Sequence, residues 1–183
     1  MALEGKLRHP KRFITTHDAQ GKAVVDTSLP EDAPFYELPN KEAAFAQCYV
    51  TNAFPARLES DADLAVYRDF LRSPPGLTVS GGTVLRYVDM PPGQTSAMHR
   101  TVSLDYGVVI EGEAELLLDS GETRLLKRGD VCVQRATMHA WRNPSETEWA
   151  RVLFVLLPCE PFETAAGKTE EDLGGMSGVR ASS

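Results

Sequence analysis

The sequence predicts a single all-β domain, a sandwich or barrel. From residue 83 onward, short β-rich blocks follow one another at intervals of about ten residues, each closed by a glycine turn. The turns are Glu111-Gly112, Asp119-Ser120-Gly121 and Arg128-Gly129-Asp130. A chain of 183 residues is long enough to bury one substantial core, and it contains no internal repeat.

Composition narrows the possible partners and the compartment. The formal net charge of −7, with no compensating basic block, argues against a nucleic acid or an anionic membrane surface as partner. Three widely spaced cysteines, Cys48, Cys132 and Cys159, are typical of reduced thiols in the cytoplasm. The first residues lack the apolar region of a signal peptide, and no run approaches the roughly 18 apolar residues that span a membrane.

The first 76 residues are expected to form an extension packed on the barrel. Alternation in its last strand would place Phe45, Gln47, Tyr49 and Thr51 on one face. A short helix is expected over residues 60–71, with Ser60 as its N-cap. The strands expected here are residues 12–16, 22–26 and 45–54.

The barrel itself is expected to occupy residues 77–160. A tail over residues 161–183 is polar and rich in glycine and serine, which predicts one short helix near Glu163 and a disordered end. The strands expected in the barrel are residues 83–89, 96–101, 105–110, 113–118, 123–126, 131–134, 139–142 and 149–157.

Residues 93–112 carry the first of two motifs that identify a family resemblance. Gly93 is followed by five residues and His99, then by Thr101, three more residues, Asp105, six residues and Gly112. These intervals resemble those of the first motif of the cupin superfamily, Gly, five residues, His-x-His, three or four residues, Glu, six residues, Gly. Two residue types differ, because Thr101 stands for the second histidine and Asp105 for the glutamate.

Residues 129–143 resemble the second motif of the cupins. It begins with Gly129-Asp130 and ends with His139 and Asn143, although Arg135 stands where cupins have proline and the block is one residue shorter. Two motifs in the right order imply a double-stranded β-helix, the jelly-roll barrel of the cupins. The fold alone implies little about the reaction, because this barrel hosts many activities.

Within the superfamily, the blocks HRT-x-S-x-DYG and MHAWRN resemble small single-barrel cupins of fungal and bacterial natural-product pathways. That resemblance implies dehydration, decarboxylation or isomerisation of polyketide-like or aromatic intermediates.

Two histidines and one carboxylate form the candidate catalytic site. Alternate residues of a strand share a face, and in a cupin-like barrel His99, Asp105 and His139 would converge on the interior. Such a set suits Fe(II), and also Zn, Mn or Ni, without an organic cofactor. The competing interpretation is a metal-free pocket in which a histidine acts as general acid or base.

Five further residues are candidates for binding the substrate. Thr101 could hydrogen-bond the substrate or a metal-bound water, and Arg86 could bind a carboxylate or an enolate. Trp141, Tyr49 and Met98 could line an apolar pocket. The alternative is that the aromatic residues and the methionine belong to the core and that the arginine lies in water.

Three functions remain open at this point. The leading one is a lyase (dehydratase or decarboxylase) or isomerase of small-molecule metabolism, and the second is an Fe(II)-dependent dioxygenase. The third is a non-catalytic, small-molecule-binding cupin. Because barrels of this type have open sheet edges, a two-fold homodimer is expected.

Overall fold

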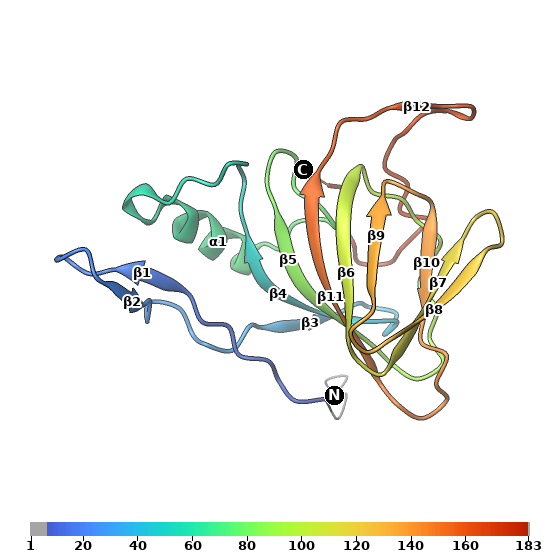
Figure 1. Cartoon of the computed structure of the whole chain (residues 1–183), viewed down its shortest axis with the longest axis horizontal. Coiled ribbons are helices and arrows are strands. Elements are labelled where there is room, and N and C mark those ends of the chain that lie inside the picture. Colours follow the sequence, from blue (N-terminus) through green and yellow to red (C-terminus); the bar gives the residue numbers. More distant parts are fainter. Residues whose placement is uncertain (1–6, 183) are drawn as a thin grey trace.

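The structure, a computed structural model that describes residues 7–182, is built on two antiparallel sheets that face each other as a barrel (Figure 1). The large sheet has the strand order β3-β4-β5-β11-β6-β9, and the small sheet has the order β10-β7-β8. Val109 and Val152 of the large sheet pack with Ala114 and Trp141 of the small sheet in one core cluster. The expected all-β cupin-type barrel is confirmed.

Most barrel strands lie close to the ranges predicted from the glycine turns and the alternation of apolar residues. Their bounds are β5 Val84–Met90, β6 Ser103–Glu111, β7 Glu113–Leu118, β8 Thr123–Lys127, β9 Val131–Arg135, β10 His139–Arg142 and β11 Ala150–Pro158. Along β6 the odd-numbered residues from Ser103 to Val109 are buried, whereas Tyr106 is exposed. This period of two is what a strand with one face on the core requires.

One expected strand is absent. Residues 96–101 make only isolated bridges, from His99 to His139 and from Arg100 to Asp172. The segment does not form a continuous ladder with one strand, because His99 pairs with β10 and Arg100 pairs with the C-terminal tail. It nevertheless fixes His99 against β10 through backbone hydrogen bonds of 2.8 and 2.9 Å in both directions.

Part of the expected N-terminal extension is part of the barrel. Strand β4 (Ala44–Val50) pairs with β5, and β3 (Phe35–Glu37), which the sequence did not predict, pairs with β4. The other two strands of the extension, β1 (Thr15–His17) and β2 (Ala23–Val25), form a separate hairpin, which lies with α1 to one side of the barrel (Figure 1).

The expected helix is confirmed, but its start is different. Helix α1 (Ala62–Arg72) follows a short 3₁₀ turn, η1 (Glu59–Asp61), and its N-cap is Asp61 rather than Ser60. Neither residue caps the helix with its side chain, since both adopt left-handed backbone angles. Across residues 7–182 there is no helix with the length and apolar character needed to cross a membrane.

The tail differs from its expectation. In place of a helix near Glu163, the two-residue strands β12 (Glu163–Thr164) and β13 (Gly167–Lys168) form a small hairpin. The chain then returns to the barrel, where Asp172 pairs with Arg100. The side chains of Leu173, Met176 and Val179 pack against the core cluster of Leu38, Ala43, Phe45 and Leu77. Apolar residues spaced along a polar segment therefore anchor it.

Candidate functional site

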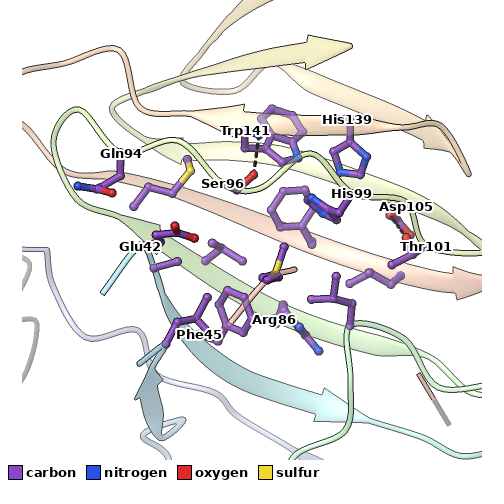
Figure 2. Close-up of a pocket in the computed structure, with 18 residues that line it drawn as sticks. Glu42, Phe45, Arg86, Gln94, Ser96, His99, Thr101, Asp105, His139 and Trp141 are labelled. Carbon is purple, nitrogen blue, oxygen red and sulfur yellow. Dashed lines mark hydrogen bonds between the residues drawn. The ribbon is translucent and has the colours of Figure 1, made fainter. Parts of the chain in front are cut away.

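An apolar cavity opens inside the barrel, and it holds most of the residues that the sequence singled out (Figure 2). The space between its walls, including the open mouth, is about 750 Å³. Strands of both sheets, the segment before β6 and the C-terminal tail contribute to it. The polar or charged residues that line it are Glu42, Arg86, Gln94, Ser96, His99, Thr101, Asp105 and His139.

His99 and His139 form a pair on one wall of the cavity. Their ring centroids are 4.2 Å apart. The Nδ1 atom of His99 lies 2.8 Å from the carbonyl oxygen of Ala97, and that of His139 lies 2.9 Å from the carbonyl oxygen of Thr137. A carbonyl oxygen can only accept, so each Nδ1 carries the hydrogen. The lone pair of each ring is therefore on Nε2.

Burial keeps both rings neutral. His99 is 8% exposed and His139 is 3% exposed. Burial lowers the pKa of His99, and burial together with the neighbouring His99 lowers the pKa of His139 to about 3. Two neutral imidazoles with free Nε2 lone pairs are the form in which histidine binds metals.

Asp105 is the buried carboxyl group of the cavity. The Thr101 hydroxyl donates to its Oδ2 over 3.5 Å and accepts a hydrogen bond of 2.7 Å from Ser103. Oδ1 is buried without a hydrogen-bond partner among the described residues. Burial raises the pKa of Asp105 to about 6, against the lowering effects of Ser103, Thr101 and Arg86. This carboxyl group therefore titrates near neutral pH.

The histidine pair fits a divalent metal, but the third expected ligand does not join it. Both Nε2 lone pairs are available. The hydrogen bond from each Nδ1 to a backbone carbonyl fixes the orientation of the ring, as is usual for histidines that bind a metal through Nε2. Within residues 7–182, however, no three His, Cys, Asp or Glu side chains are grouped closely enough to hold a metal. Asp105 is one methylene shorter than the glutamate of the cupin motif, so its carboxyl group reaches less far.

Aromatic rings form the floor of the cavity. Trp141 of β10 packs edge-on against Phe154 of β11, with ring centroids 5.6 Å apart. Gly107 of β6 lies opposite Phe154 in the ladder, and a Cβ atom there would lie 2.9 Å from the Phe154 ring. Because Gly107 has no side chain, the Phe154 ring can pack over its backbone. An apolar floor of this kind suits an aromatic or polyketide-like ligand.

Arg86 of β5 lies on the same inner face and is 2% exposed. Its Nη2 donates a 2.9 Å hydrogen bond to the carbonyl oxygen of Gly76, and its guanidinium lies over the ring of Phe45 at 5.1 Å from the ring centroid. Its Nε has no hydrogen-bond partner among the described residues. The charge of Arg86 is thus buried, and no carboxylate of residues 7–182 is bonded to it.

Comparison with known proteins identifies the family. The chain is 49% identical over 174 residues to phomopsin biosynthesis cluster protein C' of Diaporthe leptostromiformis, which covers 95% of this chain and 89% of that protein. The family model described as cupin domain matches residues 86–156. The chain belongs to the cupin superfamily.

Two further matches extend the comparison. A cupin-domain-containing oxidoreductase of Aspergillus ruber is 41% identical over 169 residues, or 91% of this chain and 81% of that protein. The cupin domain of Cnp3 from Schizosaccharomyces pombe is 11% identical, with a TM-score of 0.50 over 82% of this chain and 88% of that chain. At this identity the second match concerns the fold alone.

Two of the residues proposed to bind substrate do not line the cavity of this cupin. Tyr49 lies on the opposite face of β4, where its ring packs on Tyr67 of α1 and its hydroxyl donates to Asp63. A register shift between Gln47 and Tyr49 inserts one extra residue and reverses the alternation. Met98 is half-buried and also lies outside the cavity lining. Thr101, Trp141 and Arg86 do line it.

Several lining residues were not identified from the sequence of this cupin. Ser96 accepts a 3.0 Å hydrogen bond from the backbone nitrogen of Trp141, as Figure 2 shows, and so ties the segment before β6 to β10. Phe45 and Phe154 contribute rings from two strands of the large sheet, and Met176 reaches the cavity from the tail. Parity could have found the two phenylalanines, but no local pattern predicts the return of Met176.

Proposed function

We propose that this cupin is an enzyme of secondary-metabolite biosynthesis that carries out non-redox chemistry, as a dehydratase, decarboxylase or isomerase, on a polyketide-like or aromatic small molecule. Two observations support the pathway and the substrate class. A relative with 49% identity is named as a biosynthesis cluster protein. The cavity floor is aromatic and apolar, which suits such a molecule.

The observation that carries the proposal is the chemistry of Asp105. A buried carboxyl group with a pKa of about 6 and an unpartnered Oδ1 is suited to take up and return a proton near neutral pH. In a dehydration, Oδ1 would accept the proton from the carbon next to a carbonyl group (the α carbon). The bond between the β carbon and its hydroxyl oxygen would break, and a double bond would form between the α and β carbons. The departing hydroxide would then take that proton and leave as water. In an isomerisation the proton would return to another carbon.

His99 and His139 are proposed as the protein ligands of a divalent metal, Zn, Mn, Fe or Ni. Such a metal supplies Lewis-acid polarisation of a carbonyl oxygen when it is bound. Thr101 holds Oδ2 of Asp105, which leaves Oδ1 for the substrate. Trp141 and Phe154 pack on the substrate and exclude water from it.

Replacement of His99 or His139 by alanine tests the role of the pair. We expect metal content to fall below half and turnover to fall at least about 100-fold, with the far-ultraviolet circular dichroism unchanged. His17, an exposed histidine of β1, provides the matched control, and His17→Ala should retain both metal and activity. Turnover at the wild-type rate in both cavity variants would place the active site elsewhere. Loss of metal with full activity would favour the metal-free acid–base mechanism.

An Fe(II)-dependent oxidation is the second candidate, because a relative of 41% identity is named an oxidoreductase. The two candidates differ in their need for oxygen. A panel of aromatic and polyketide-like hydroxy ketones and keto acids, analysed by mass spectrometry, should show loss of water or CO₂, or rearrangement, under anaerobic conditions. Zn or Mn should serve as well as Fe. Stoichiometric uptake of O₂ would establish the oxidative reaction instead, and binding without any conversion would indicate a non-catalytic cupin.

We further propose that the chain acts in the cytoplasm as a two-fold homodimer. The cysteines Cys48, Cys132 and Cys159 are all free thiols, which suits a reducing compartment. The outer face of the edge strand β9 exposes Val131 and Val133 at 60% and 56%, next to Tyr106 of β6. Light scattering should give twice the chain mass of 20.1 kDa. The variant Val133→Glu should shift it toward one chain mass.

A further inference from the structure

Arg86 is a buried cation, and only some of its hydrogen-bond donors have a partner among the described residues. It donates one hydrogen bond to the Gly76 carbonyl and lies over the ring of Phe45. Within residues 7–182 it forms no salt bridge, and Asp105 acts on it only through its charge, without a hydrogen bond. Because desolvation of a charged group is costly, a buried guanidinium without an anionic partner is unusual unless a ligand supplies one. Its position on the cavity wall makes such a ligand possible.

The neighbouring strand adds a second unpartnered group. Gln47 of β4 lies directly opposite Arg86 in the ladder and is 2% exposed. Neither its amide nitrogen nor its amide oxygen has a hydrogen-bond partner among the described residues. Two adjacent buried side chains thus have unused hydrogen-bonding atoms, Nε of Arg86 and the amide of Gln47, and of the two only Arg86 lines the cavity.

The ladder fixes what lies between Arg86 and the carboxyl group of the site. In the large sheet β11 separates β5 from β6, so Phe154 and Leu156 lie between Arg86 and Asp105 on the inner face. Arg86 is opposite Phe154 and Gly107 in the ladder, and Asp105 is two residues from Gly107, so two inter-strand steps of 4.7–4.9 Å and a rise of about 3.3 Å per residue separate the two backbone positions by about 12 Å. An aromatic ring with a short side chain spans a distance of this order. Both side chains between Arg86 and Asp105 are apolar.

We propose that Arg86 is the anion anchor of this cavity and that its ligand is an organic carboxylate with an aromatic or similarly flat apolar body. The carboxylate accepts hydrogen bonds from the Arg86 guanidinium, and the body lies over Phe154 and Leu156 toward Asp105 and the histidines. The inference rests on the proposed function only in taking this cavity as the substrate site. It requires no particular reaction.

Binding to metal-free protein tests the anchor separately from catalysis. The protein is treated with EDTA, desalted and titrated by isothermal calorimetry with trans-cinnamate and with its neutral analogue cinnamamide. We expect the carboxylate to bind at least about tenfold more tightly, since a charge-assisted bidentate pair replaces a neutral contact. In Arg86→Met the two probes should bind with equal affinity, whereas Arg86→Lys should keep part of the preference.

Arg135 provides the matched control, because it is an exposed arginine on β9 outside the cavity lining. Arg135→Met removes the same charge and should leave the preference for cinnamate unchanged. Equal binding of both probes by the wild-type protein, or no binding of either at millimolar concentration, would overturn the proposal. A preference that persists in Arg86→Met would also overturn it. A requirement for O₂ in turnover would contradict the proposed non-redox reaction, but it would leave the measured affinities for cinnamate and cinnamamide, and so the role of Arg86, unchanged.

Discussion

Two buried arginines of neighbouring strands have opposite surroundings. Arg151 of β11 forms a bidentate salt bridge with Asp89 of β5, with both nitrogen–oxygen distances at 2.6 Å, and it also donates to the carbonyl oxygen of Arg8. Arg86, three residues before Asp89 on β5, has one hydrogen bond to a backbone oxygen and an unpartnered Nε. The two side chains are almost equally buried, at 4% and 2% exposure.

The difference distinguishes a structural charge from one that is available to a ligand. Arg151 is neutralised within the protein and lies between the rings of Phe35 and Tyr87, with its guanidinium 5.4 and 5.5 Å from their centroids. It ties the first residues of the chain to the barrel. Arg86 lines the cavity, and no anionic side chain in the described part of the chain is bonded to it. The same residue type therefore serves stability on one face of the sheet and, on our proposal, recognition on the other.

The largest effect that sharpens this comparison is expected at Arg151. In Arg151→Met the carboxylate of Asp89 stays buried without its partner, so we expect a loss of roughly 3–5 kcal/mol in the free energy of unfolding. Urea denaturation followed by tryptophan fluorescence measures it. A loss below about 1 kcal/mol would mean that water reaches Asp89, and the distinction between the two arginines would fail.

Asp105 offers a test at the carboxyl group of the cavity. Its pKa in the folded protein is raised from 3.8 to about 6, so the folded state binds more protons than the unfolded state between these values. Its contribution to stability is therefore present below about pH 4 and lost as the pH rises to 6. The shift corresponds to roughly 3 kcal/mol at most.

The variant Asp105→Asn removes this titration. The free energy of unfolding of the variant, measured in urea with EDTA present, should increase relative to that of the wild type as the pH rises from 4 to 7. A constant difference across this range would show that the carboxyl group is solvated or paired in solution. The comparison between variants cancels the titration of all other groups.

The smallest effect is expected at Arg86 itself. Replacement of a buried charge by an apolar side chain of similar length is often neutral or stabilising, so Arg86→Met should raise the free energy of unfolding by about 1 kcal/mol. The expected sign is opposite to that of Arg151→Met. A loss of more than about 2 kcal/mol would indicate that the guanidinium is paired inside the protein and would remove the contrast.

The barrel and its histidines could be predicted from the sequence because both depend on local patterns. Glycine turns mark the strand ends, and His99 and His139 occupy fixed intervals within two motifs. Features that depend on irregularity could not be predicted in the same way. One extra residue at Cys48 turns Tyr49 away from the cavity, and simple alternation has no signal for it.

Distant contacts account for the rest. The bridge between Arg100 and Asp172 joins segments 72 positions apart, and the polar composition of the tail predicts a short helix near Glu163 and a disordered end instead. The exchange of glutamate for Asp105 is visible in the sequence, but the motif intervals alone do not show that the shorter side chain is not grouped with the two histidines. Sequence intervals thus predicted which residues face the interior but not how far each one reaches.

The tail has a consequence for how this cavity could be redesigned. Gly174 approaches the Met98 carbonyl so closely that a Cβ atom there would lie 2.0 Å from the oxygen, while two residues later Met176 lines the cavity. One lining residue of the cavity, Met176, is therefore encoded outside the barrel strands, on a segment that shares none of their ladders. Gly178, two residues further on, has a positive φ, and a Cβ atom there would lie 2.2 Å from the Pro39 ring. A mutant library confined to Met176 would therefore vary the shape of the cavity while leaving this glycine and every polar lining residue in place. The shape of the cavity can accordingly be altered at a position that is distant in sequence from the histidines and Asp105.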